Sequence, residues 1–366
     1  MMELLVAMVL SSIVIYGAIS MFLASRGTAS TTNAVGAVTD NGRVALDMLG
    51  ESVRSGGAMA CNATNDIHGT VITAAGPLRQ NSILNVGGTP LQLDYNDAFS
   101  GFEALGTSPS GGAATLSAMP VAADPSGNDW SGPAGVALDG LLAGRVVQGS
   151  DVLAVRETLP QAAPVYTNVD YHGQVGSVTL NVKSVGSLQP LQYAVISDCT
   201  ASTVFQINAV DPVGLTVTTS GPLSLGGGDL QWDYPQPSAI MPVDMTVYYI
   251  APGRDGDSSL FQYDEWTGAF QELVPDVENM QVLYGIASTT PNQVTQYVTA
   301  DQVTTFNQVV AVKIAVLAAS PPGAIAVPLP QSAMVYQLLD ASITAPLDQR
   351  LRKVFETTIA VQNAAL

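Results

Sequence analysis

Histidine, cysteine and basic side chains are scarce in this sequence. It has 2 His, 2 Cys and 12 Lys and Arg against 30 Asp and Glu, which gives a net charge of −18 over 366 residues. Nucleic acid is therefore not expected as a partner, because phosphate binding needs concentrated Lys and Arg. Neither His68 nor His172 falls in a zinc-binding pattern, and the sequence contains no phosphate-binding loop or serine-nucleophile motif. We expect neither an enzyme nor a bound cofactor.

Charged residues of either sign are also few, at 11% of the chain, whereas hydrophobic residues make up 47%. This balance argues against disorder and favours a β-rich protein outside the cytoplasm. The two cysteines, Cys61 and Cys199, form an even, small set in a chain of this type. They predict one disulfide in an oxidising compartment. The alternative is a pair of buried free thiols.

The N-terminus carries a long run without charge. Residues 4–25 contain no charged side chain, and Glu3 and Arg26 flank them. At about 1.5 Å per residue, this run makes a helix of about 30 Å, the thickness of a bilayer core. No basic stretch precedes it and no A-x-A-like cleavage site ends it, so a retained anchor is favoured over a signal peptide. A carboxylate at its edge, Glu3, is a candidate functional residue.

The helical pattern continues beyond Arg26. Apolar residues return at helical spacing at Val35, Val38, Ala45, Leu46, Leu49 and Val53. Between the two halves, residues 27–32 (GTASTT) have poor helix propensity, and Ser55-Gly56-Gly57 provides a glycine stop. We predict one long helix over residues 1–56, membrane-spanning at 4–25 and amphipathic afterwards. The alternative is an anchor, a flexible linker and a separate short helix.

Strand and turn signals dominate residues 57–366. We therefore predict an α+β protein in which the long helix packs on a large, mostly antiparallel, β-rich globular domain. Residues 101–149 are low in charge and rich in Gly, Ser, Ala and Pro, which predicts a long, low-complexity surface insertion containing Trp130. The candidate strands are residues 91–95, 151–156, 177–182, 193–197, 203–209, 215–219, 229–233, 243–250, 260–263, 280–286, 309–317 and 354–361.

Two local clusters allow a binding interpretation. Asp255 and Asp257, in the segment GRDGD, are a weak calcium candidate, although a plain β-turn fits the segment better. The aromatic residues Trp232, Tyr234, Tyr248 and Tyr249 allow a sugar-binding platform, but at strand spacing they are more typical of a core.

The opening segment Glu3-Leu4-Leu5-Val6-Ala7-Met8, followed by an uncharged helix, resembles type IV pilins and type II secretion pseudopilins. In that superfamily a prepilin peptidase removes a basic leader, and a glutamate occupies the fifth mature position. Glu3 matches that glutamate if two mature residues and the leader precede Met1 in the complete protein. The resemblance implies that Glu3 is the subunit-docking residue and pairs with the α-ammonium group of a neighbouring subunit.

Later segments resemble PilW-type minor pilins of the type IV pilus. The segments that carry this resemblance are Asn41–Asp47, Arg54–Gly57 with Cys61, Gly149–Arg156, Ser197–Cys199 before Val204–Ile207, Val277–Gly285, Tyr297–Asp301 before Val309–Ile314, and Arg352–Val361.

This resemblance implies a structural minor pilin that primes pilus assembly and sits in or near the pilus tip complex. Its expected partners are other minor pilins, the major pilin and a tip adhesin, with roles in cell adhesion and twitching motility. Its expected location is the bacterial inner membrane, crossed once with the globular domain in the periplasm, and then the pilus on the cell surface. The alternatives are a J-type pseudopilin of type II secretion and a membrane-tethered carbohydrate-binding adhesin or hydrolase.

Overall fold

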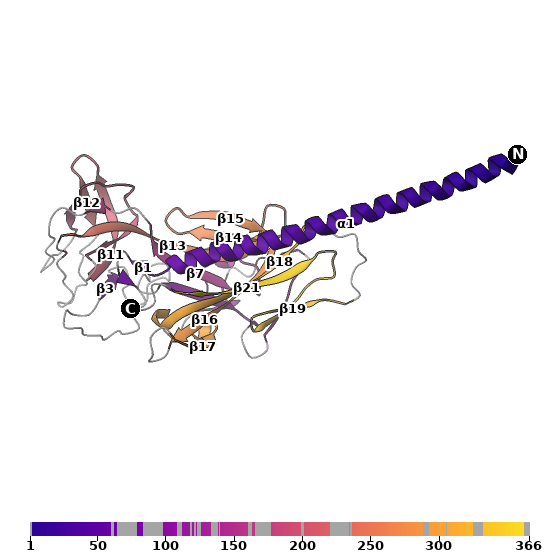
Figure 1. Ribbon diagram of the computed structural model, residues 1–366. Coiled ribbons are helices and arrows are strands. Elements are labelled where there is room, and N and C mark those ends of the chain that lie inside the picture. The colour runs from indigo at the N-terminus through magenta and orange to yellow at the C-terminus, as the bar shows by residue number, and fades with distance from the viewer. Residues whose placement is uncertain are drawn as a thin grey trace.

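The computed structural model is an α+β fold, as predicted: a long N-terminal helix projects from a large, mostly antiparallel β domain (Figure 1). The residues that the structure describes are 2–59, 62–63, 79–82, 98–107, 112–117, 119–120, 122, 126–132, 138, 140–159, 163–164, 177–198, 201–219, 234, 236–287, 293–304, 306–324 and 332–361.

The helix α1 spans Met2–Ser55 without interruption. It ends where the sequence predicts, because Gly57 has a φ of +78°, a left-handed conformation that glycine adopts without a Cβ clash. The weak stretch at residues 27–32 is helical, and there the Thr28, Thr31 and Thr32 hydroxyls donate to carbonyls one turn earlier. The alternative of a linker followed by a separate helix is therefore wrong.

The largest sheet has β13 (Ala239–Pro252) at its centre, and this strand is long enough to pair with different strands along its length. Its start pairs with β10 (Tyr193–Ser197), and its middle and end pair with β7 (Val152–Thr158) and β14 (Ser258–Asp264). Beyond these strands the sheet adds β4 (Phe99–Ala104), β6 (Trp130–Ser131), β15 (Ala269–Pro275), β11 (Ala201–Asp211), β12 (Thr216–Thr219), β9 (Thr179–Asn181), β3 (Arg79–Ser82) and β8 (Ala163–Pro164).

A second sheet lies beside it, with four strands in the order β17 (Val294–Val298), β16 (Val277–Ala287), β18 (Val309–Ala319) and β21 (Arg352–Ala360). A small sheet, made of β19 (Val335–Leu338), β20 (Ala341–Thr344) and β5 (Ala113–Thr115), packs on the face of β18 that points away from α1. Because β18 is covered on both faces, its sequence VVAVKIAVLAA is an almost continuous apolar run.

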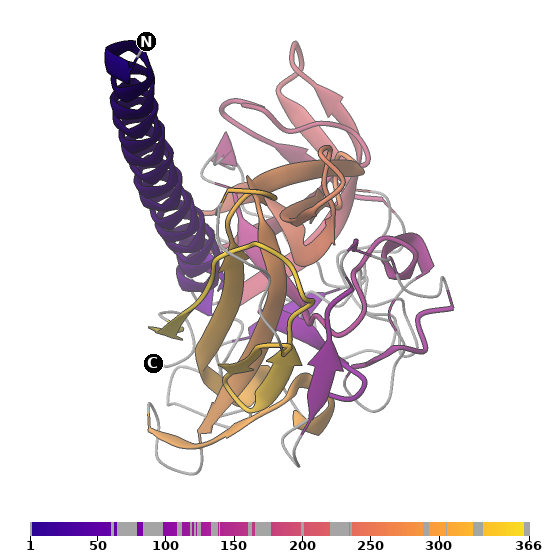
Figure 2. The same cartoon turned by 90° about the vertical axis from the view of Figure 1, so that its right-hand side faces the viewer.

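The main core lies between α1 and the two large sheets, as Figure 2 shows with α1 along one side of the domain. The helix contributes a stripe of Ala45, Leu49 and Val53, and one turn earlier Gly42 faces the Phe355 ring of β21. A Cβ atom at Gly42 would overlap that ring, so glycine allows the close approach of helix and strand. A separate cluster fills the lobe of β9 to β12, at the opposite end of the molecule from the N-terminus (Figure 1).

The short elements are β1 (Ala58–Met59), which pairs with β2 (Asn62–Ala63), α2 (Gly140–Ala143), and two 3₁₀ turns at Ala300–Gln302 and Phe306–Gln308.

The prediction of a surface insertion at residues 101–149 is wrong for much of its described part. Trp130 is only 2% exposed, and its indole Nε1 donates to the Ser150 carbonyl at 2.9 Å. Phe102 and Leu142 join it in a buried cluster against β13. The cause of the error is composition: the many Gly, Ser and Pro residues of this segment surround a few well-spaced apolar side chains that form core.

Several sequence predictions lie outside the described residues. They are Cys61, Cys199, His68, His172, Trp232 and the candidate strands at 91–95 and 229–233. Of the proposed aromatic platform, Tyr234, Tyr248 and Tyr249 are described, and all three are buried core residues, as the core interpretation predicts.

Candidate functional site

The N-terminal half of α1 extends away from the domain (Figure 1). Its apolar side chains are exposed on every side of the helix. Val14 is 70% exposed and Tyr16 77% exposed. A helix that is apolar all round is stable only when lipid or protein covers it. Its exposed large apolar residues are Met8, Leu10, Ile13, Val14, Ile15, Tyr16, Ile19, Met21, Phe22 and Leu23.

Among the described residues, α1 is the one helix long and apolar enough to cross a membrane, and the apolar part that meets this criterion is not buried in the domain. It is therefore a candidate membrane anchor. The same surface would serve equally well against apolar helices of other subunits, because lipid tails and leucine-rich helices are similar apolar surroundings.

Glu3 lies in the first turn of α1 with its side chain exposed. At about 1.5 Å per residue, it lies about 45 Å along the helix from Ala34, the first helix residue buried against the domain. The prediction that Glu3 docks a neighbouring subunit stays a prediction. Its position leaves the carboxylate free of the domain and available to another chain.

The C-terminal half of α1 is fixed to the domain. It contacts β15 on one side and β16, β18 and β21 on the other. The Asn41 side-chain amide donates to the Pro275 carbonyl at 3.0 Å, and Ser30 donates to the carbonyl of Ala324 where the helix leaves the domain. The helix therefore changes from fully exposed to docked within about one turn, close to residue 30.

The calcium candidate at Asp255 and Asp257 is the turn of the β13–β14 hairpin. The Gly253 amide donates to the Asp257 carbonyl at 2.7 Å, and Gly256 adopts a φ of +85°. The Asp257 carboxylate accepts a hydrogen bond from Arg350 at 2.8 Å. Asp255 is exposed at the tip of the turn, whereas the Asp257 carboxylate is engaged by Arg350. The β-turn interpretation describes this segment.

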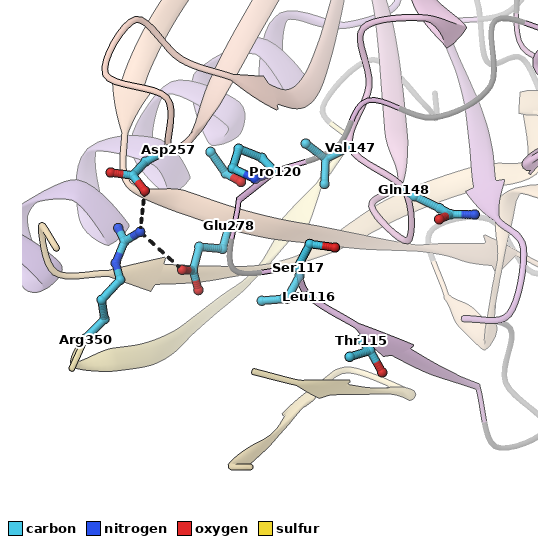
Figure 3. Close-up of a pocket in the computed structure, with 10 residues that line it drawn as sticks. Thr115, Leu116, Ser117, Pro120, Val147, Gln148, Asp257, Glu278 and Arg350 are labelled. Atoms are coloured by element: carbon cyan, nitrogen blue, oxygen red, sulfur yellow. Dashed lines mark hydrogen bonds and ion pairs between the residues drawn. The ribbon is translucent and has the colours of Figure 1, made fainter. Parts of the chain in front are cut away.

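A small cavity lies next to this hairpin, and Figure 3 shows Arg350 at its edge, with Asp257 and Glu278 facing the guanidinium. Arg350 also pairs with Asp276 at 2.5 Å. The cavity volume is about 40 Å³, which holds little more than ordered water. Sugar- or drug-sized ligands need about 300 Å³ or more, so the carbohydrate-binding alternative finds no support in this cavity.

The neighbouring Arg352 forms a bidentate pair with Glu278, with Nε and Nη2 at 2.5 and 2.9 Å from the two carboxylate oxygens. Asp348 accepts two further hydrogen bonds from the same guanidinium at 2.7 and 2.6 Å. Arg350 and Arg352 therefore join the hairpin turn, the start of β16 and the start of β21. Carboxylates already pair with both guanidinium groups. The cluster therefore stabilises the packing of these three segments and is not an anion-binding site.

A buried acidic pair, Glu103 and Asp151, escaped the sequence analysis. The Asp151 carboxylate accepts the backbone amides of Ala104 at 3.0 Å and Val282 at 2.8 Å. Burial raises the pKa of Glu103, and the nearby Asp151 carboxyl raises it further; burial likewise raises the pKa of Asp151. These side chains lie 48 positions apart, and the pairing of β4 with β7 brings them together.

Two polar atoms, one in the pair and one beside it, lack a hydrogen-bond partner within the described part of the chain. They are Glu103 Oε2 and the Tyr284 hydroxyl, and both are buried. Burial raises the pKa of Tyr284 well above its usual value, and the two carboxyls add to the effect. Through the amides of Ala104 and Val282, Asp151 joins the two large sheets.

The comparison with protein families gives a match. Residues 247–363 match the family model described as Type IV Pilus-assembly protein W. No curated protein matches the chain. The matched stretch runs from the middle of β13 to the end of β21, and so contains the β13–β14 hairpin, the second sheet and the Arg350–Arg352 cluster. It agrees with the sequence resemblance of the same strands. The match covers less than half of the chain and supports a PilW-type assignment.

Proposed function

We propose that this protein is a non-enzymatic minor pilin that primes type IV pilus assembly at or near the pilus tip. The observation that carries the proposal is α1: one continuous helix whose first half is apolar and uncovered and whose second half is fixed to the matched β domain. In the inner membrane the uncovered half spans the bilayer, with the domain in the periplasm. In the filament the same half packs against the helices of other minor pilins and of the major pilin.

Glu3 is the proposed docking residue. A carboxylate in apolar surroundings is costly unless it is paired, and an α-ammonium group of a neighbouring subunit would neutralise it there. The pairing fixes the axial register between two helices whose apolar sides would otherwise slide freely. A tip adhesin, cell adhesion and twitching motility follow from the tip position and belong to the same proposal.

The test is deletion of the gene followed by counting of surface pili and measurement of twitching. We expect loss of most pili, restoration by the full chain, and failure of a Glu3→Ala chain that reaches the membrane in normal amount. Glu3→Asp should restore pili in part, because it keeps the charge on a shorter stem. Unchanged piliation in the deletion strain would refute the assembly role. Full activity of Glu3→Ala would refute the docking role alone.

A further inference from the structure

A groove runs beside the last two turns of α1, well away from the apolar half of the helix. Its volume is about 350 Å³. One wall is the helix, and the other consists of neighbouring strands of the largest sheet. The lining residues are Met48, Glu51, Ser52 and Ser55 from α1, Glu157 from β7, Tyr248 from β13, Gln262 from β14 and Leu273 from β15. We refer to it as the α1–β15 groove.

The walls of the groove combine apolar surface with acidic side chains. Met48 is 39% exposed, and Leu273 and the Tyr248 ring continue the apolar surface. Among the described residues of the lining, Glu51 and Glu157 are the charged ones, and none is Lys, Arg or His. Burial raises the pKa of Glu157; the Ser55 hydroxyl opposes this rise and the Glu51 carboxylate adds to it. A carboxylate under such conditions gains from any cation that enters.

Acidic side chains extend beyond the groove along the same face of the sheet. Asp244 lies directly opposite Glu157 in the pairing of β13 with β7, and shares a face with Tyr248 because side chains alternate along a strand. Burial and the nearby Asp264 carboxylate raise the pKa of Asp244 to about 7. Arg54, the cation of the last helical turn, extends over Gly50, on the side of the helix opposite Met48. The face is therefore acidic over several strands.

From this arrangement we infer that the α1–β15 groove docks a Lys- or Arg-bearing segment of a neighbouring pilus subunit. A long basic side chain fits both surfaces of the groove, since its alkyl stem packs on Met48, Tyr248 and Leu273 while its charged end reaches Glu51 and Glu157. A second copy of this chain is a poor occupant, because its charge of −18 brings mainly like charge to an acidic face. The choice of a pilus subunit as the source rests on the proposed function.

The test uses the full chain in piliated cells. A photo-crosslinking residue replaces Met48 (Met48→benzoylphenylalanine) in one strain and Tyr16 (Tyr16→benzoylphenylalanine) in another, and mass spectrometry maps the crosslinked peptides. We expect the Met48 position to attach to another pilin, within about three residues of a Lys or Arg, the reach of one basic side chain. The Tyr16 position reports the helix packing of the proposed function separately.

The double variant Glu51→Gln/Glu157→Gln should lower the Met48 adduct about tenfold, because it removes the charge while keeping shape and hydrogen-bonding capacity. The control Asp255→Asn/Glu356→Gln removes two exposed acids elsewhere and should leave the adduct unchanged. Thermal unfolding of each variant shows whether the domain is intact.

Three outcomes would overturn the inference while leaving the assembly role in place, provided that Tyr16 crosslinks to pilins. The first is the absence of any adduct at Met48. The second is an adduct to lipid, to a second copy of this chain or to a segment without Lys or Arg. The third is an adduct whose yield the Glu51→Gln/Glu157→Gln variant does not lower. No pilin adduct at either position would overturn both proposals.

Discussion

At the scale of single residues, the chain places carboxyl groups where water cannot reach them. Glu103, Asp151 and Asp244 are each buried, and in each case the pKa rises chiefly because burial disfavours the charged form. Asp348 behaves in the opposite way, since the Arg352 guanidinium overcomes the effect of burial and lowers its pKa. The direction of the pKa shift of a carboxyl thus follows from the balance between its burial and the groups that pair with it.

This difference gives a prediction for pH dependence. A carboxyl with a raised folded-state pKa holds a proton that the unfolded chain releases, so its contribution to stability falls as pH rises above the unfolded value. We expect the free energy of unfolding of the domain to fall between about pH 5 and pH 9. The lowered pKa of Asp348 acts only below this window. Urea denaturation of the full chain in detergent, followed by Trp fluorescence, measures the trend.

The variant Glu103→Gln should flatten this dependence and raise stability at pH 8 by about 1 kcal/mol or more, since one pKa unit corresponds to about 1.4 kcal/mol. Asp255→Asn, at the exposed hairpin tip, is the control and should leave the slope as in the unaltered chain. A stability that rises with pH, or parallel curves for Glu103→Gln and the unaltered chain, would contradict the assignment of Glu103 as a protonated buried group.

At the scale of elements, the sequence predicts α1 and the central strands well. Helical spacing of apolar residues locates the docked stripe, and β-branched runs locate β10, β13, β16 and β18. Strand β4 (FSGFEA) escaped prediction, because Gly101 lies in its middle and Glu103 points into the core. Both residues are unusual in a strand and make sense only against neighbours distant in sequence: Gly101 makes room for Tyr284, and Glu103 is held protonated beside Asp151.

The candidate docking groove could not be predicted for a similar reason. It takes its residues from α1 and four strands, and its acidic character comes from cross-strand pairing that no local pattern encodes. Glu3, in contrast, is proposed as a docking residue from sequence alone, because an acid at the edge of an uncharged run stands out without any knowledge of the fold; its docking role stays a prediction.

The docking of α1 on β21 is testable with a pair of glycines on the same helix. Gly36 has open space around it, whereas a Cβ at Gly42 would overlap the Phe355 ring. We expect Gly36→Ala to raise the free energy of unfolding by up to about 1 kcal/mol through helix propensity. Gly42→Ala should lower it by about 1–3 kcal/mol through overpacking.

Chemical denaturation of the two variants measures the difference, and Phe355→Leu in the Gly42→Ala background should recover part of the loss. Equal effects of the two Ala substitutions would show that helix and strand approach each other less closely than the structure indicates.

At the scale of the whole molecule, the predicted disulfide would link the segment after α1 to the lobe built by β9 to β12. Cys61 lies between β1 and β2 in the sequence, and Cys199 lies between β10 and β11. The chain-entropy model gives about 5 kcal/mol of stabilisation for a loop this long, as an upper value. We predict that alkylation without reductant leaves both thiols unlabelled and that reduction exposes two.

Mass spectrometry of the intact chain after each treatment counts the labels. Two labels before reduction would refute the disulfide. The variant Cys61→Ser/Cys199→Ser then measures its contribution to stability, and the single variant Cys61→Ser controls for loss of one side chain.

The continuous α1 also has a mechanical consequence. Under the proposed function, a pilus under tension is pulled along its long axis, and the load would enter this subunit through the apolar half of α1. Because the docked half lies along the domain from about residue 30 to residue 55, that pull acts as shear on the helix–sheet contacts, and all of them share the force at once. The helix would have to slide out along its own length rather than peel away turn by turn, so the subunit should resist extraction far better than its equilibrium stability suggests.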